Sequence, residues 1–169
     1  MGVALTALRI VGMGLTVLPA ELCTSLPSLT LLSLGGNQLM SLPENIVELT
    51  KLTDLLLPKN NLICLPDRIG LMCSLTRIEL SSNKLESLPI TFALQKLLKV
   101  ECECNSLRLL PENLNHLVSC TVVNVNQNKL IRLPKSLGRM PSLTSLSCAK
   151  NNISYIPQEL SECRTMKVL

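Results

Sequence analysis

Residues 52–66 of the sequence read LTDLLLPKNNLICLP, with six leucines and one isoleucine around a pair of asparagines and a final Leu-Pro. Neither the 3.6-residue period of a helix nor the simple alternation of a strand explains this spacing. The stretch has counterparts along the whole chain, because Leu-Pro or Ile-Pro pairs recur at intervals of 22 to 24 residues. Their prolines are Pro19, Pro43, Pro66, Pro89, Pro111, Pro134 and Pro157. The chain is therefore built from repeats of about 23 residues.

An asparagine stands six residues before the proline in six of the seven repeats, and Met13 takes this place in the first. The six are Asn37, Asn60, Asn83, Asn105, Asn128 and Asn151. An asparagine amide both donates and accepts hydrogen bonds, so a stacked row of them can satisfy backbone groups that a sharp turn leaves without partners. We expect a structural asparagine ladder and an irregular first repeat whose apolar residues, Leu5 among them, still belong to the core.

Apolar residues occupy fixed positions around each asparagine, and the consensus reads LxxLxLxxNxLxxLPxxL. This pattern resembles the leucine-rich repeat family. It is most similar to the typical LxxLP class of the Ras-associated leucine-rich repeat scaffolds and of the Scribble, Erbin and densin group. The resemblance covers residues 1–169 as a single leucine-rich repeat domain of seven repeats, and residues 166–169 begin an eighth. Because no polar terminal cap is visible at either end, we expect a fragment of a longer protein.

The fold class expected is α/β. The resemblance implies a right-handed α/β horseshoe, a solenoid with a parallel β-sheet on its concave face and short helical or extended segments on its convex face. Strand alternation should turn Leu55 and Leu57 inward and Asp54 and Leu56 outward. Convex segments such as residues 44–51 leave room for about two helical turns. The strands should centre on residues 30–34, 53–57, 76–80, 98–102, 121–125 and 144–148.

Composition excludes several classes of protein. Hydrophobic residues make up 47% of the chain and aromatic residues only 1%, which favours a layered aliphatic interior. The net charge of +4 comes from scattered residues without a basic run, so we expect no nucleic acid partner. The longest apolar stretches, near residues 10–23 and 26–35, are shorter than the roughly 18 residues that span a bilayer. The sequence therefore predicts no membrane span.

No catalytic constellation is visible in the sequence. The single histidine, His116, lies in a convex segment without a carboxylate or serine partner in the repeat register. Gly35 and Gly36 are not followed by the Gly-Lys-Ser/Thr of a phosphate loop, and we interpret them as a bare patch on the concave face. We expect no catalytic, cofactor-binding or metal-binding residue, no cofactor and no small-molecule substrate.

The eight cysteines are dispersed among the repeats, without a C-x-x-C pair. Cys102 and Cys148 occupy the sixth, inward position of the consensus, and Cys120 occupies the first. Such cysteines act as small core residues. Dispersed thiols predict a reduced, cytoplasmic chain, in which Cys104 is the thiol we expect to be accessible.

The positions that architecture leaves free are the third, fifth, seventh and eighth of each repeat, on the concave face. Leu31 and Leu56 should form an exposed apolar spot there, beside clustered charges. An apolar anchor with a charged rim is the usual anatomy of a protein interface. The candidate partner-binding residues are Leu31, Asp54, Leu56, Lys59, Arg77, Glu79, Lys99, Glu101 and Glu103.

The sequence thus predicts a non-catalytic protein-protein interaction module or scaffold of intracellular signalling. The resemblance implies a small GTPase, a phosphatase or a polarity or signalling protein as partner. An alternative is a substrate-recognition or regulatory segment of a larger enzyme, such as a kinase, GTPase or ubiquitin ligase, whose catalytic domain is absent. A third possibility, an extracellular receptor ectodomain, is disfavoured because secreted relatives carry clustered cysteines in flanking caps.

Overall fold

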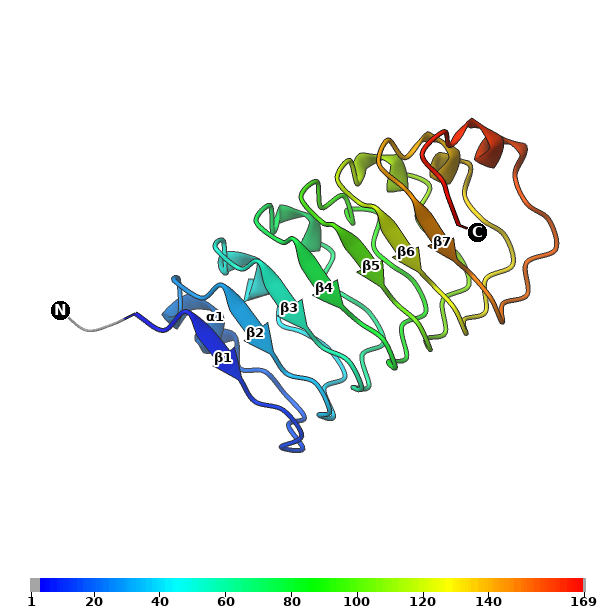
Figure 1. Ribbon diagram of the computed structural model, residues 1–169. Helices are drawn as coiled ribbons and strands as arrows, with labels where there is room; N and C mark the ends of the chain where they lie inside the picture. The colour runs from blue at the N-terminus through cyan, green and yellow to red at the C-terminus, as the bar shows by residue number, and fades with distance from the viewer. Residues whose placement is uncertain (1–3, 169) are drawn as a thin grey trace.

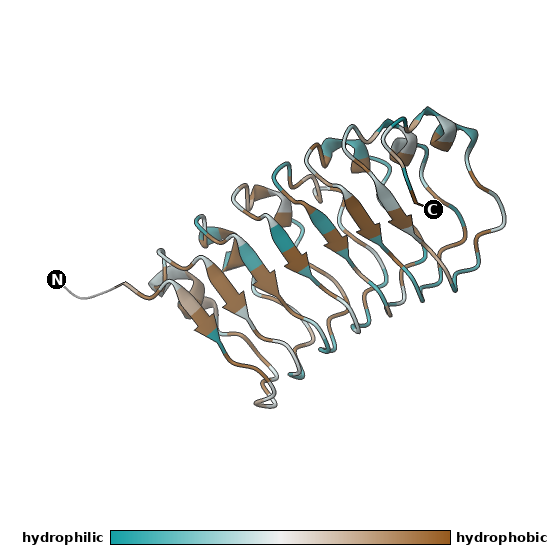
Figure 2. Cartoon of the chain, viewed as in Figure 1, coloured by the Kyte–Doolittle hydropathy of each residue, from teal (hydrophilic) through white to brown (hydrophobic). Residues whose placement is uncertain are grey.

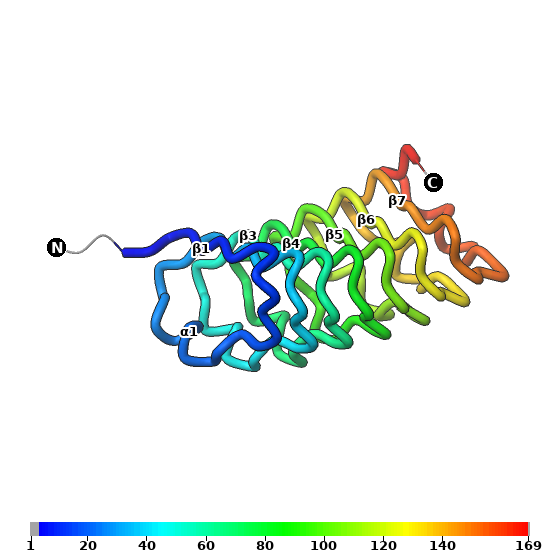
Figure 3. The backbone as a smooth tube through the Cα atoms, turned by 90° about the horizontal axis from the view of Figure 1, so that it is seen from below, coloured from blue at the N-terminus to red at the C-terminus, as the bar shows by residue number. Residues whose placement is uncertain are grey.

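The computed structural model describes residues 4–168 of the chain. Each repeat makes one turn of a continuous coil, with a short strand on one side and a short helical or irregular segment on the opposite side (Figure 1). The tube view shows the successive turns stacked along one axis (Figure 3). The fold is a leucine-rich repeat solenoid, as the sequence predicts.

Seven strands form one parallel sheet, in chain order from β1 to β7. Each strand pairs with the next at the same position of the repeat, so that Leu55 of the third repeat lies between Leu32 and Ile78. The strands are β1 Ala7–Arg9, β2 Leu31–Ser33, β3 Asp54–Leu56, β4 Arg77–Glu79, β5 Lys99–Glu101, β6 Val122–Asn124 and β7 Ser145–Ser147.

The predicted strand positions are confirmed, although each strand has three residues where five were expected. Leu55 and Leu57 are fully buried, whereas Asp54 and Leu56 lie on the solvent side of the sheet. The strands are short because the chain turns directly after them. Val168 forms an isolated parallel bridge with Ser145, which places it beside β7.

The convex segments are shorter than the two helical turns expected. The only α-helix among residues 4–168 is α1, Ala20–Ser25, and five other repeats have a 3-10 helix. Backbone N–H groups bond three residues back in these segments, as from Leu49 to Ile46, which gives the tighter turn. The 3-10 helices are η1 Glu44–Glu48, η2 Ile69–Leu71, η3 Leu114–His116, η4 Lys135–Arg139 and η5 Gln158–Glu162.

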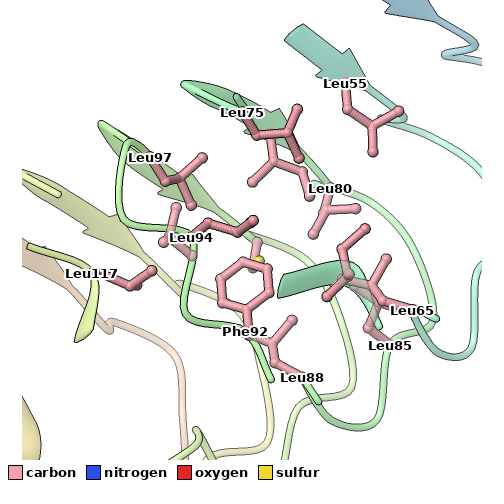
Figure 4. Close-up of a cluster of buried hydrophobic side chains, with 14 of the residues drawn as sticks. Leu55, Leu65, Leu75, Leu80, Leu85, Leu88, Phe92, Leu94, Leu97 and Leu117 are labelled. Carbon is pink, nitrogen blue, oxygen red and sulfur yellow. The ribbon is translucent and has the colours of Figure 1, made fainter. Parts of the chain in front are cut away.

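Leucines from successive repeats form one continuous core between the sheet and the convex segments. Phe92, the only phenylalanine, lies fully buried among leucines of the fourth and fifth repeats (Figure 4). It occupies the position three residues after the proline, where most repeats have leucine or isoleucine. The layered aliphatic interior expected from the composition is therefore present, with the aromatic ring filling one layer.

The asparagine ladder joins each repeat to the one before it. The Oδ1 of Asn83 accepts a hydrogen bond from the backbone N of Leu62 at 3.0 Å. Its Nδ2 donates to the carbonyl oxygens of Leu57 and Leu80, both at 2.9 Å. The same bonds recur at the other five positions, Asn37, Asn60, Asn105, Asn128 and Asn151.

Asn37 also binds the irregular first repeat. Its Oδ1 accepts hydrogen bonds from the backbone N of Met13 and of Leu15. The expectation that Leu5 is a core residue was wrong, because its side chain is 47% exposed.

The eighth position of the repeat has a left-handed backbone in all of repeats two to seven. The residues are Gly36, Lys59, Ser82, Cys104, Gln127 and Lys150, with φ between 54° and 68°. Glycine adopts this conformation without steric cost, so the left-handed backbone at this position favours glycine at residue 36. Gly35 is buried, and a Cβ there would press on the ring of Pro58. The interpretation as a bare patch was therefore wrong for Gly35, whereas Gly36 is exposed.

Replacing Asn83 with alanine should lower the free energy of unfolding by about 1–3 kcal/mol, because three buried backbone groups lose their partner. The counterpart change Met13→Ala should alter it by less than about 0.5 kcal/mol, because that side chain is 72% exposed. Urea unfolding followed by circular dichroism measures both. Equal losses in the two variants would refute the structural role of the ladder.

Candidate functional site

The solvent side of the seven-stranded sheet, which we call the sheet face, carries a hollow of about 470 Å³ over β3, β4 and β5. Hydrophilic colour marks the outer residues of β4 and β5, whereas β2 is mainly hydrophobic (Figure 2). The hollow is lined by Asp54, Thr76, Arg77, Glu79, Leu98, Lys99 and Glu101.

The hollow brings together five of the nine candidate residues, namely Asp54, Arg77, Glu79, Lys99 and Glu101. Glu103 lies outside its lining but is linked to Glu101 by hydrogen bonds through one amide group. Lys59 stands apart, in the left-handed position after β3.

The expected exposed apolar spot was wrong in its details. Leu31 and Leu56 are half-buried and do not pair across the sheet, because Leu31 lies opposite Asp54 and Leu56 lies between Ser33 and Glu79. Neither leucine lines the hollow. The sequence already places the two residues at the third and fifth positions of neighbouring repeats, and what it could not show is that both side chains are half-buried.

Like charges face each other across β4 and β5. Arg77 is the register partner of Lys99, and Glu79 is the register partner of Glu101. Like charges directly opposite on neighbouring strands are destabilising by a few tenths of a kcal/mol or more. In the part of the chain that the structure describes, the three ion pairs are Arg132–Glu112, Lys135–Glu159 and Arg139–Glu162, and none of them relieves this repulsion.

Hydrogen bonds hold the carboxylates of the face. The backbone N of Ser81 donates to Glu79 Oε1 at 3.1 Å. The Asn124 amide donates to Glu101 and to Glu103, both at 3.2 Å. A carboxylate accepts about four hydrogen bonds, so these side chains are oriented and still have free acceptor sites.

A threonine ladder along the amino ends of the strands escaped the sequence analysis, although threonine occupies the second position in six of the seven repeats. Each hydroxyl donates to the carbonyl oxygen of the equivalent residue in the preceding repeat. The donors are Thr30, Thr53, Thr76, Thr121 and Thr144. Leu98 replaces threonine in the fifth repeat, and its side chain is 50% exposed at the hollow. The replacement of threonine by leucine at position 98 is visible in the sequence and could have predicted an apolar residue at the site.

A larger hollow of about 640 Å³ lies on the last described repeat, against Leu133, Ile153 and Ile156. These three residues occupy consensus positions that pack between repeats elsewhere in the chain. The larger hollow is therefore uncovered stacking surface, and we take the smaller hollow on the sheet face as the candidate site.

The histidine and the other possible catalytic or metal-binding residues within residues 4–168 do not form a site. His116 is exposed in η3 on the convex side. Within residues 4–168, no group of three or more His, Cys, Asp or Glu side chains could hold a metal ion. The short helices of this range are also far from the length and hydropathy that a membrane crossing requires.

All eight cysteines are free thiols. Cys102 and Cys120 are buried as expected, whereas Cys148 is only partly buried in the last full repeat. The expectation for Cys104 was wrong, because Cys64 and Cys73 are the exposed thiols and Cys104 is half-buried. Burial raises the pKa of the Cys120 thiol from 9.0 to about 11. Burial also raises the pKa of Cys102, and the nearby carboxylates of Glu79 and Glu101 add to this effect.

Comparison with known proteins agrees with the geometry. Residues 4–62 match the family model described as leucine rich repeat, and no catalytic family was found. No curated protein sequence matches the chain significantly. Among solved structures, a leucine-rich repeat protein of Leptospira interrogans is 30% identical, with a TM-score of 0.68, over 92% of this chain and 46% of that one.

Two further structures share the fold at 24% identity over 98% of this chain. The ectodomain of the Arabidopsis thaliana receptor kinase GASSHO1/SCHENGEN3 has a TM-score of 0.82 and is covered over 24% of its length. The functional domain of InlJ from Listeria monocytogenes has a TM-score of 0.81 and is covered over 34%. The chain thus spans less than half the length of each of these three structures. They share the leucine-rich repeat fold with this chain and do not single out the Scribble, Erbin and densin group.

The pKa of Cys120 predicts a pH dependence of stability. The folded state keeps this proton up to about pH 11, whereas an unfolded thiol releases it near pH 9.0. The stability contributed by the buried neutral thiol is therefore complete below pH 9 and is lost as the pH rises toward 11. In Cys120→Val, the free energy of unfolding should fall less steeply over this window, by up to about 1.4 kcal/mol per pH unit.

Urea unfolding at a series of pH values measures this slope, with the exposed-thiol variant Cys64→Ser as the control. A slope that is the same in wild type, Cys120→Val and Cys64→Ser would show that the buried thiol is not responsible.

Proposed function

We propose that this leucine-rich repeat protein is a non-catalytic protein-binding module that holds a protein partner on its sheet face. The observation that carries this proposal is the hollow over β3, β4 and β5, whose charged side chains have no ion-pair partner in residues 4–168. Charged groups gathered around an apolar side chain are typical of protein interfaces.

The separation between scaffold and face supports the proposal. The solenoid is held by buried leucines, by the asparagine ladder and by the threonine row. Among the third and fifth positions of β3, β4 and β5, only Asp54 bonds to one of these supports, through the hydroxyl of Thr53. The side chains of β4 and β5 at these positions are free to vary with a partner. The Arabidopsis ectodomain was solved in complex with CASPARIAN STRIP INTEGRITY FACTOR 2, an example of this fold used for binding.

We further propose a cytoplasmic, reducing environment and a partner from intracellular signalling, such as a small GTPase, a phosphatase or a polarity protein. Eight free thiols, four of them buried, support a reducing compartment. The class of partner rests on the resemblance of the repeat consensus alone.

Glu101→Lys should weaken binding of the partner by about 1–4 kcal/mol, because it reverses a charge at the hollow. The matched control is Glu44→Lys, which reverses an exposed charge at the start of η1 on the opposite side of the solenoid. Affinity purification with quantitative mass spectrometry measures partner recovery, and thermal unfolding measures stability. We expect wild-type melting temperatures for both variants within a few degrees.

Recovery that is lost only in Glu44→Lys would place the partner on the convex side and overturn the proposal. Loss in both variants together with lowered melting temperatures would show that the site residues are structural, which also contradicts it.

A further inference from the structure

We propose that the hollow recognises an extended partner segment carrying an acidic and a basic residue two positions apart, with an apolar residue two positions from the acidic one on its other side. This inference rests on the proposed function and specifies the chemistry of the partner. It comes from three features of β4 and β5: a positive row, a negative row and one exposed leucine.

The charges of the two strands are sorted into rows. Arg77 and Lys99 form the positive row at the amino ends of the strands, and Glu79 and Glu101 form the negative row at the carboxyl ends. Asp54 of β3 lies opposite Arg77 on its other side without forming an ion pair with it, so Lys99 is the cation of this row that has no neighbouring carboxylate in register. The rows are two residues apart along each strand, which corresponds to about 6.6 Å. Alternate side chains of an extended peptide lie on one face with the same spacing. An extended segment can therefore present one opposite charge to each row.

Partner charges would also remove a repulsion that the free protein carries. A carboxylate between Arg77 and Lys99 would contact two cations, and a cation between Glu79 and Glu101 would contact two anions. A partner with charges of a single sign would satisfy one row and repel the other. Charge complementarity of this kind selects partners as well as adding affinity.

The negative row is already positioned in the free protein. Glu79 is held by the backbone of Ser81, and Glu101 shares the Asn124 amide with Glu103. Glu103 extends the negative charge beyond the hollow, where it also accepts a bond from the Gln127 side chain at 2.9 Å. Preorganised carboxylates lose little conformational entropy on binding a cation, which favours a lysine or arginine at this place.

Leu98 supplies the apolar contact. It precedes Lys99 in the chain and lines the hollow beside Arg77 and Thr76. Its side chain is half exposed at a position where six other repeats have threonine. Because Leu98 lies next to the positive row, the partner's apolar residue belongs two positions from its acidic residue, on the side away from the basic one, where its side chain lies on the same face as both charges.

The experiment is a selection of random peptides of about twelve residues, displayed on phage, against the immobilised full chain. Selected peptides are then synthesised, and their affinities are measured by fluorescence anisotropy for wild type, Arg77→Glu, Glu101→Lys and Leu98→Ser. The matched control is Arg68→Glu, which reverses an exposed charge next to η2 on the convex side. Circular dichroism verifies the fold of each variant.

We expect enrichment of an acidic and a basic residue two positions apart, with an apolar residue two positions from the acidic one on its other side. Affinity should fall about tenfold or more in Arg77→Glu and Glu101→Lys, by a smaller factor in Leu98→Ser, and remain unchanged in Arg68→Glu. A selected peptide whose acidic residue is changed to lysine should bind Arg77→Glu/Lys99→Glu more tightly than it binds wild type.

Two outcomes would overturn the inference in different ways. Peptides that bind the sheet face but carry charges of one sign, or none, would refute this partner chemistry and leave the proposed function standing. Peptides whose binding is lost in Arg68→Glu and retained in the sheet-face variants would refute both, as would a selection that enriches no binding peptide.

Discussion

The structure depends on one amide group per repeat. After each strand the chain turns into the solenoid, and the backbone groups at this turn cannot join the sheet. In repeat after repeat, an asparagine accepts from the preceding turn and donates to carbonyl oxygens of both turns, as Asn83 does with Leu62, Leu57 and Leu80. Buried backbone groups without partners would cost about 1–3 kcal/mol each, so the amide both closes its own turn and binds the preceding turn to it.

Buried leucines and the asparagine ladder hold the repeats together, so the strand residues that face solvent are not needed for the fold. In the central repeats, like charges at these positions lower the stability of the sheet, since Arg77 faces Lys99 and Glu79 faces Glu101. Sites that are kept despite a local cost in stability are commonly functional.

The sequence predicted what depends on regular repetition. The strand positions, the inward leucines and the ladder follow from fixed spacings, so Leu55, Leu57 and Asn83 could be placed correctly. Features that depend on relations between repeats were missed. The partial burial of Leu31 and Leu56 and the close approach of Pro58 to Gly35 became clear only in the structure. Leu98 became visible as a candidate only once the threonine bonds of its neighbours were seen.

The central claim is that the charges of the hollow serve binding and not the fold. The most direct test is the free energy of unfolding of a variant in which Arg77, Glu79, Lys99 and Glu101 are all replaced with glutamine. Glutamine keeps the approximate length and the hydrogen-bonding capacity of these side chains while removing both like-charge pairs. The account predicts a free energy of unfolding equal to or greater than that of wild type in low salt. A decrease of more than about 1 kcal/mol would contradict it, because the charges would then be part of what holds the solenoid together.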